Sequence, residues 1–135
     1  MSGETSRHVL LVEALIATIE VRYQFGQGII VLADHHRFGV NRPPKLGVFT
    51  PDLFAHDLPI TTRILGEAKT EADLESDRSS LQLGAFLDHL ALYENSTMYV
   101  AVPWRTAPRA RSLLRQIRRL EHATVALHVI PVPIG

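Results

Sequence analysis

Apolar residues recur along this chain with two different periods, which separate the expected helices from the expected strands. Over residues 6–23 they are spaced three and four positions apart, and this spacing predicts a helix with one buried face. Residues 29–33 form a short continuous run rich in β-branched side chains, which favours a buried strand. The chain is therefore expected to begin with a helix that is followed by a strand.

Two further strands are expected close together, over residues 46–55 and 62–70. The connection formed by residues 56–59 is short enough to join them as an antiparallel hairpin. Pro51 lies inside the first of them and has no backbone N–H, so this part is expected at a sheet edge or in a bulge. The residues before the hairpin, 35–44, are polar and end in two prolines, which predicts a loop.

Helices and strands alternate in the second half of the chain. A helix is expected from residue 76 or 78 to residue 92, and the pattern continues with a strand over 97–103, a helix over 109–122 and a strand over 125–132. Strand–helix–strand segments form parallel pairs through right-handed crossovers. The predicted fold class is therefore α/β, with a mixed central sheet flanked by helices in a single domain of residues 1–135.

Composition narrows the class of protein. The absence of cysteine excludes disulfides, thiolate zinc sites and cysteine nucleophiles. Neither a secretory signal nor a membrane span is evident, so a soluble protein of the cytoplasm with no membrane partner is expected. A net charge of zero argues weakly against bulk attraction to nucleic acid, although residues 105–119 contain six arginines and no acid. Of the 14 basic residues, the only lysines are Lys45 and Lys69.

The segment Gly66–Thr70 contains the residues with the clearest chemical meaning. Side chains alternate across a strand, so Glu67 and Lys69 are expected on the same face of the sheet. Asp52 lies on the neighbouring strand of the expected hairpin, beside Glu67 if the register brings the two level. Two carboxylates and an ammonium group at one point suit a hard divalent cation that prefers oxygen ligands. A cross-strand ion pair is the alternative interpretation.

Pro51–Asp52 followed by Glu67-x-Lys69 on the next strand resembles the motif of the PD-(D/E)XK nuclease superfamily. The expected order of elements over residues 6–103 is similar to the αβββαβ core of this restriction-endonuclease-like fold, and the last helix and strand would form a C-terminal αβ extension. The resemblance implies that Asp52 and Glu67 bind Mg²⁺ or Mn²⁺, with the Ala68 carbonyl as a third ligand. It also implies that Lys69 orients or activates the attacking water during phosphodiester hydrolysis.

The resemblance suggests two further site residues. Gln82, on the helix after Lys69, is similar to a glutamine that many members place beside the site, and an exposed helical glutamine is the alternative. Many members also carry a supporting glutamate on the first helix. Glu13 and Glu20 share one helix face, and Glu13 is the candidate chosen here, although the sequence does not decide between them. Phe86 departs from the family pattern, because some members have tyrosine there.

Basic residues in two regions are candidates for contacting nucleic acid. Arg37, Arg42 and Lys45 lie in the loop before the hairpin, where they could touch a phosphate backbone. The last expected helix carries a stripe of arginines, which either grips phosphates or is an ordinary solvated helix face; these are Arg111, Arg115, Arg118 and Arg119.

The expected function is that of a magnesium-dependent nuclease acting on DNA, either as a homodimer or with a partner protein that supplies target specificity. The competing hypothesis is a nuclease-like fold retained as a non-catalytic binding or assembly module. The zero net charge and Phe86 favour the module, whereas the intact set of Asp52, Glu67 and Lys69 favours catalysis.

Overall fold

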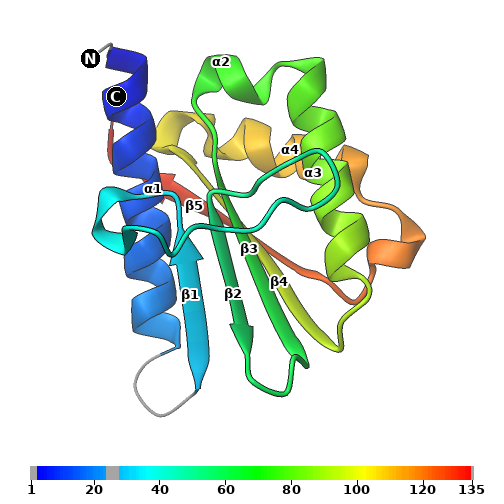
Figure 1. Ribbon diagram of the computed structural model, residues 1–135. Helices are drawn as coiled ribbons and strands as arrows, with labels where there is room; N and C mark the ends of the chain where they lie inside the picture. Colours follow the sequence, from blue (N-terminus) through cyan, green and yellow to red (C-terminus); the bar gives the residue numbers. More distant parts are fainter. Residues whose placement is uncertain (1–2, 24–27, 135) are drawn as a thin grey trace.

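The computed structural model describes residues 3–23 and 28–134, whose strands form one five-stranded mixed sheet (Figure 1). The strands lie in chain order across the sheet; they are β1 (Ile29–Ala33), β2 (Leu53–Asp57), β3 (Thr62–Ala68), β4 (Asn95–Pro103) and β5 (Ala126–Val132). The β1–β2 and β2–β3 pairs are antiparallel, and the β3–β4 and β4–β5 pairs are parallel. The predicted α/β class with a mixed sheet is confirmed.

Helices cover both faces of this sheet (Figure 1). Helix α1 (Gly3–Arg22) lies on one face, and α3 (Asp77–Leu90) and α4 (Ala107–Ile117) lie on the other. Four shorter helices complete the described part of the chain; they are η1 (His36–Phe38), α2 (Glu71–Leu74), η2 (Trp104–Thr106) and η3 (Leu120–His122). Within residues 3–23 and 28–134, none of these helices has the length and apolar character needed to cross a membrane.

The alternation of side chains along the strands builds two separate apolar cores. Leu53 on β2 and Ile64 on β3 are buried against α1, whereas Phe54 and Leu65, the next residue on each strand, are buried against α3 and α4. Because the period along a strand is two, residues 52, 67 and 69 fall on the α3 side of the sheet. The strand pattern thus directs these three polar side chains to one face.

Gly66 allows α1 to approach the sheet closely. A Cβ atom at this position would lie 3.0 Å from Leu53 Cβ and 3.2 Å from Leu15 Cδ2, so the neighbouring side chains would have to move. Figure 1 shows that α1 begins at the same end of the sheet at which β3 ends and α3 begins. The close packing at Gly66 therefore helps to fix the start of α1 relative to the C-terminal end of β3.

The expected strand over residues 46–55 is wrong in its first half. Strand β2 begins only at Leu53, and the preceding residues form a loop with one isolated bridge between Leu46 and Phe49. Pro51 cannot donate to a ladder, and Gly47 has a φ of 67° that suits a turn. Phe49 is buried edge-on against Phe86 of α3, with ring centroids 6.4 Å apart, so this loop packs onto the α3 side.

The expected helix over residues 109–122 ends earlier than its apolar pattern indicates. Helix α4 stops at Ile117 because Arg118 is extended, and the Arg118 guanidinium then donates to the carbonyls of His122, Ala123 and Val125. The short helix η3 follows, so the predicted arginine stripe does not continue past Arg115. The remaining expected helices and strands are present, with bounds that differ by at most three residues, and α2 is an addition.

Replacing Gly66 with valine is expected to lower the free energy of unfolding by about 1–3 kcal/mol, because the side chain overpacks the contact between α1 and the sheet. Gly84→Ala is the matched control. A Cβ atom there meets nothing nearer than Ile117 Cγ2 at 3.8 Å, so alanine in the interior of α3 is expected to stabilise by about 0.4–1 kcal/mol. Urea unfolding measures both effects, and equal stabilities of the two variants would contradict this account.

Candidate active site

A cleft of about 270 Å³ lies where β3 ends, between the start of α1 and the first turns of α3. Residues from five parts of the chain line it, and among them are three acids, two bases, a histidine and a glutamine: Asp52, Glu67, Asp73, Lys69, Arg78, His8 and Gln82. Four of the residues expected to act together, Asp52, Glu67, Lys69 and Gln82, are in this set. The structure thus brings these four side chains to one cleft.

Asp52 and the segment Glu67–Ala68 exchange two hydrogen bonds. The register pairs Leu53 with Gly66, so the preceding and following residues, Asp52 and Glu67, lie level across the hairpin. The Asp52 N–H donates to Glu67 Oε1 at 3.0 Å, and the Ala68 N–H donates to Asp52 Oδ2 at 2.8 Å. On the other side, the Asp34 N–H donates to the Asp52 carbonyl at 2.8 Å. Asp52 is thus fixed from both neighbouring segments although it precedes β2.

The ammonium group of Lys69 is held between two oxygen atoms. Lys69 Nζ lies 3.3 Å from Glu67 Oε2 and also donates to Gln82 Oε1 on α3. Its backbone N–H donates to the Ala101 carbonyl at 3.0 Å, which continues the pairing of β3 with β4. The side chains of Glu67 and Lys69 are 3% and 9% exposed, so this ion pair is largely removed from solvent.

Burial places Glu67 in an unusual electrostatic setting. Desolvation raises the pKa of the Glu67 carboxyl well above its usual range, the nearby charge of Asp52 raises it further, and the Lys69 ammonium opposes the rise. The Lys69 ammonium offsets only part of this effect at Glu67, so the site favours an additional positive charge or a proton.

His8 belongs to the site, and sequence reasoning missed it. Its Nε2 atom lies 3.3 Å from Asp52 Oδ1, and this hydrogen bond is the main reason that the pKa of His8 is raised. His8 lies on the first helix, where the sequence analysis expected a glutamate. The helical pattern does not reveal which turn of α1 reaches the end of β3, because that depends on how the helix packs on the sheet.

The two glutamates considered on α1 lie elsewhere. Glu13 Oε2 is 3.2 Å from His35 Nε2, and Glu20 Oε2 is 3.0 Å from Arg37 Nη2. Neither glutamate is among the residues that line the cleft. The structure therefore does not bring Glu13 to the expected metal ligands, because it lies more than one turn beyond His8 along the helix.

Two of the three basic residues proposed for nucleic-acid contact are engaged in ion pairs on the protein itself. Arg37 is paired with Glu20 as described, and Arg42 Nη1 lies 2.5 Å from Asp34 Oδ1. Lys45 is exposed in the loop before β2. Among these three, Lys45 keeps the charge most accessible to a phosphate.

A different group of possible metal ligands lies at η3. Ligand atoms of Asp88, Glu121 and His122 lie within 4.8 Å of one another. His122 Nδ1 accepts from the Arg119 N–H, so its Nε2 carries the proton that is donated to Asp88 at 2.7 Å. The Arg119 guanidinium also pairs with both acids at 2.8 Å. These bonds tie η3 to α3 and supply the positive charge that a cation would otherwise bring.

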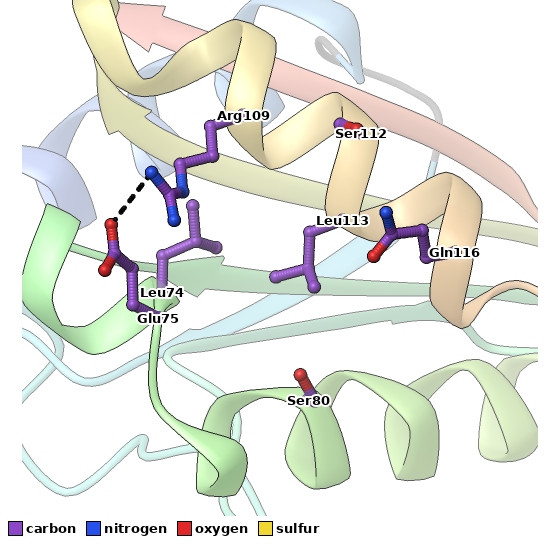
Figure 2. A pocket seen from close by; sticks show the side chains of 7 residues that line it. All are labelled: Leu74, Glu75, Ser80, Arg109, Ser112, Leu113 and Gln116. Carbon is purple, nitrogen blue, oxygen red and sulfur yellow. Dashed lines mark ion pairs between the residues drawn. The ribbon is translucent and has the colours of Figure 1, made fainter.

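A second hollow, of about 340 Å³, lies between α3 and α4 (Figure 2). Figure 2 shows Arg109 pointing toward Glu75, and their Nη1 and Oε1 atoms are 3.1 Å apart. The rest of its lining consists of Leu74, Ser80, Ser112, Leu113 and Gln116. Although this hollow is larger, it lacks the converging carboxylates and lysine of the cleft, so the cleft is the better candidate for chemistry.

No protein-family model, no curated protein and no solved structure matches this chain. The chemistry proposed for the protein therefore rests on the geometry and electrostatics of the cleft.

The raised pKa of Glu67 predicts a specific pH dependence of stability in metal-free protein. At pH values between the unfolded and the folded pKa of Glu67, the folded state holds a proton that the unfolded chain has already released. The stability that this proton contributes is therefore complete below the unfolded pKa and is lost as pH rises through the folded pKa. Glu67→Gln cannot titrate and is expected to flatten this fall. Chemical unfolding at a series of acidic and neutral pH values measures the stability of both proteins. Parallel curves of stability against pH for wild type and variant would exclude a raised pKa at Glu67.

Proposed function

We propose that this protein is a metal-dependent nuclease that hydrolyses phosphodiester bonds in DNA, with the αβββαβ core of the restriction-endonuclease-like fold. The observation that carries the proposal is the convergence of Asp52, Glu67 and Lys69 in one cleft at the end of two adjacent strands. The order α1, β1, β2, β3, α3, β4, with β3 and β4 parallel, supports the expected core, and α4 and β5 would be its extension.

The residues of the cleft suit a hard divalent cation. Asp52 and Glu67 would hold Mg²⁺ or Mn²⁺, with the Ala68 carbonyl as a further oxygen donor. The fit is supported by the raised pKa of Glu67, since a bound cation would stabilise the ionised carboxylate that burial and Asp52 disfavour. When bound, such an ion polarises a phosphoryl oxygen and lowers the pKa of a coordinated water.

Lys69 would orient the attacking water and stabilise negative charge on the phosphate. Its ammonium is held by Glu67 on one side and Gln82 on the other, and these contacts restrain it at the cleft. His8 holds Asp52 Oδ1 from the α1 side and would keep that carboxylate in place. The two acids would thus bind the cation, Lys69 would position the attacking water, and Gln82 and His8 would hold Lys69 and Asp52 in place.

Recognition of DNA would depend on more than the bulk charge of the chain, which is zero. The basic residues best placed to contact DNA are Arg78, which lines the cleft, and Lys45, which is exposed on the loop that leads to Asp52. Target specificity would then come from a second copy of the chain or from a partner protein.

One observation favours the alternative of a non-catalytic binding or assembly module. Protein donors engage all four carboxylate oxygens: Glu67 binds the Asp52 N–H and Lys69, and Asp52 binds the Ala68 N–H and His8. The two carboxylates are therefore satisfied within the protein, as they would be in a purely structural cap on the β2–β3 hairpin.

Cleavage assays distinguish the two functions. With Mg²⁺ or Mn²⁺, the wild-type protein is expected to cut at least one substrate among single-stranded, duplex and branched DNA and RNA. Asp52→Ala and Lys69→Ala are each expected to lose at least about 100-fold in rate, the usual effect of removing a transition-state contact. Glu13→Ala is the matched control and should retain activity, because Glu13 contacts His35 outside the cleft.

Persistent DNA binding with no metal-dependent cleavage of any of these substrates would favour the module. Activity that survives both substitutions would place the chemistry elsewhere in the molecule.

A further inference from the structure

The first turn of α3 forms another wall of the same cleft. Ser76 caps this helix of 14 residues, and its Oγ accepts from the Ser79 N–H at 3.1 Å. Ser76, Arg78 and Ser79 all line the cleft together with the carboxylates. The first N–H groups of a helix lack intrahelical acceptors, and the helix dipole adds partial positive charge at this end. This end of α3 is thus favourable for an anion, although helix geometry alone does not define a site.

Ser79 provides an independent indication of a ligand. Ser79 is 1% exposed, and among residues 3–23 and 28–134 its Oγ finds no hydrogen-bond partner, although the residue lines the cleft. A buried hydroxyl without a partner costs folding free energy, and alanine at this helical position would avoid that cost. A hydroxyl that donates to a bound ligand oxygen would explain why serine is present here.

Arg78 supplies the charge beside this hydroxyl. Its guanidinium carbon lies 5.0 Å from the centre of the Phe49 ring, and Phe49 is in turn packed against Phe86. Within the described part of the chain, Arg78 takes part in no ion pair. The guanidinium is therefore positioned by stacking, and its planar set of N–H donors stays available for bidentate contact with phosphate oxygens.

The charges around the cleft limit where an anion can bind. Asp52, Glu67 and Asp73 repel it, and Lys69 is already occupied by Glu67 and Gln82. The α3 wall, with Arg78 and the helix terminus, is the part of the lining where positive charge is not already paired. A phosphate group is favoured over a carboxylate because it offers more oxygens to a hydroxyl, a guanidinium and backbone N–H groups together.

We propose that the side chains of Arg78 and Ser79 and the backbone N–H groups of residues 77 and 78 form a phosphate-binding subsite of the cleft. This inference rests on the proposed nuclease function: the subsite would hold a phosphodiester group of the DNA adjacent to the one being hydrolysed, and so would set the position of the strand relative to Asp52 and Glu67.

Inorganic phosphate added to metal-free protein at low ionic strength tests the subsite without requiring catalysis. In amide NMR spectra, saturable shifts are expected at residues 77–80. Ser79→Ala and Arg78→Gln are each expected to weaken phosphate binding about tenfold, the loss of one hydrogen bond to a charged group. Ser80→Ala and Arg109→Gln are matched controls in the other hollow and should bind phosphate as the wild type does.

Stability measurements separate this role from a structural one. Ser79→Ala is expected to unfold at the same or a higher urea concentration than the wild type while it loses phosphate affinity. Lower stability with unchanged phosphate affinity would overturn the inference. Phosphate-induced amide shifts that spread over the arginines of α4 would also overturn the inference. The same holds if acetate binds as tightly as phosphate.

Mn²⁺ titrations of the same variants separate this inference from the proposed function. The Ser79 and Arg78 variants are expected to bind Mn²⁺ as the wild type does, and Asp52→Ala is expected to lose that binding. Phosphate binding at α3 in a protein that does not bind Mn²⁺ would support the subsite and count against the nuclease. Mn²⁺ binding at Asp52 without phosphate binding at α3 would overturn the subsite alone.

Discussion

The site depends on the exchange of two hydrogen bonds between Asp52 and the segment Glu67–Ala68. Regular pairing of β2 with β3 stops at Leu53, and Pro51 cannot donate an N–H to extend it. Side chains take over at that point: the Glu67 carboxylate accepts the Asp52 N–H, and the Asp52 carboxylate accepts the Ala68 N–H. The positions of both acids are therefore set by the register of the hairpin, and a shift by one residue would turn Glu67 and Lys69 toward the opposite face.

Parts of this arrangement follow from local sequence rules, and other parts do not. The shared face of Glu67 and Lys69 was predictable because the period of a strand is fixed, and the pairing with Asp52 needed only a short hairpin. The contributions of His8, Arg78 and Ser79 depend on how two helices pack on the sheet, which no local pattern specifies. Residues 46–52 have the pattern of a strand but form a loop, because the anchoring of Phe49 on α3 is likewise a tertiary contact.

The packing of α1 connects one of the two apolar cores with the cleft. Gly66 precedes Glu67 and points to the α1 side, where a larger side chain would meet Leu15. The close contact made possible by Gly66 holds α1 against β3, and the first turns of that helix then deliver His8 to Asp52. Gly66 thus sets the distance between α1 and the sheet, and the next residue, Glu67, places its carboxyl group in the cleft.

The internal hydrogen bonds of the cleft bear on whether the two acids only stabilise the hairpin. Asparagine and glutamine side chains would accept the same backbone N–H groups and would avoid the repulsion between two carboxylates. Instead the site combines Asp52 with a buried Glu67 whose pKa is raised, beside a single ammonium group. Such a pair is unfavourable as a cap, because charge repulsion and desolvation oppose it, but it is suited to exchange a proton for a divalent cation. The choice of acids over amides therefore favours the hydrolase over the structural module.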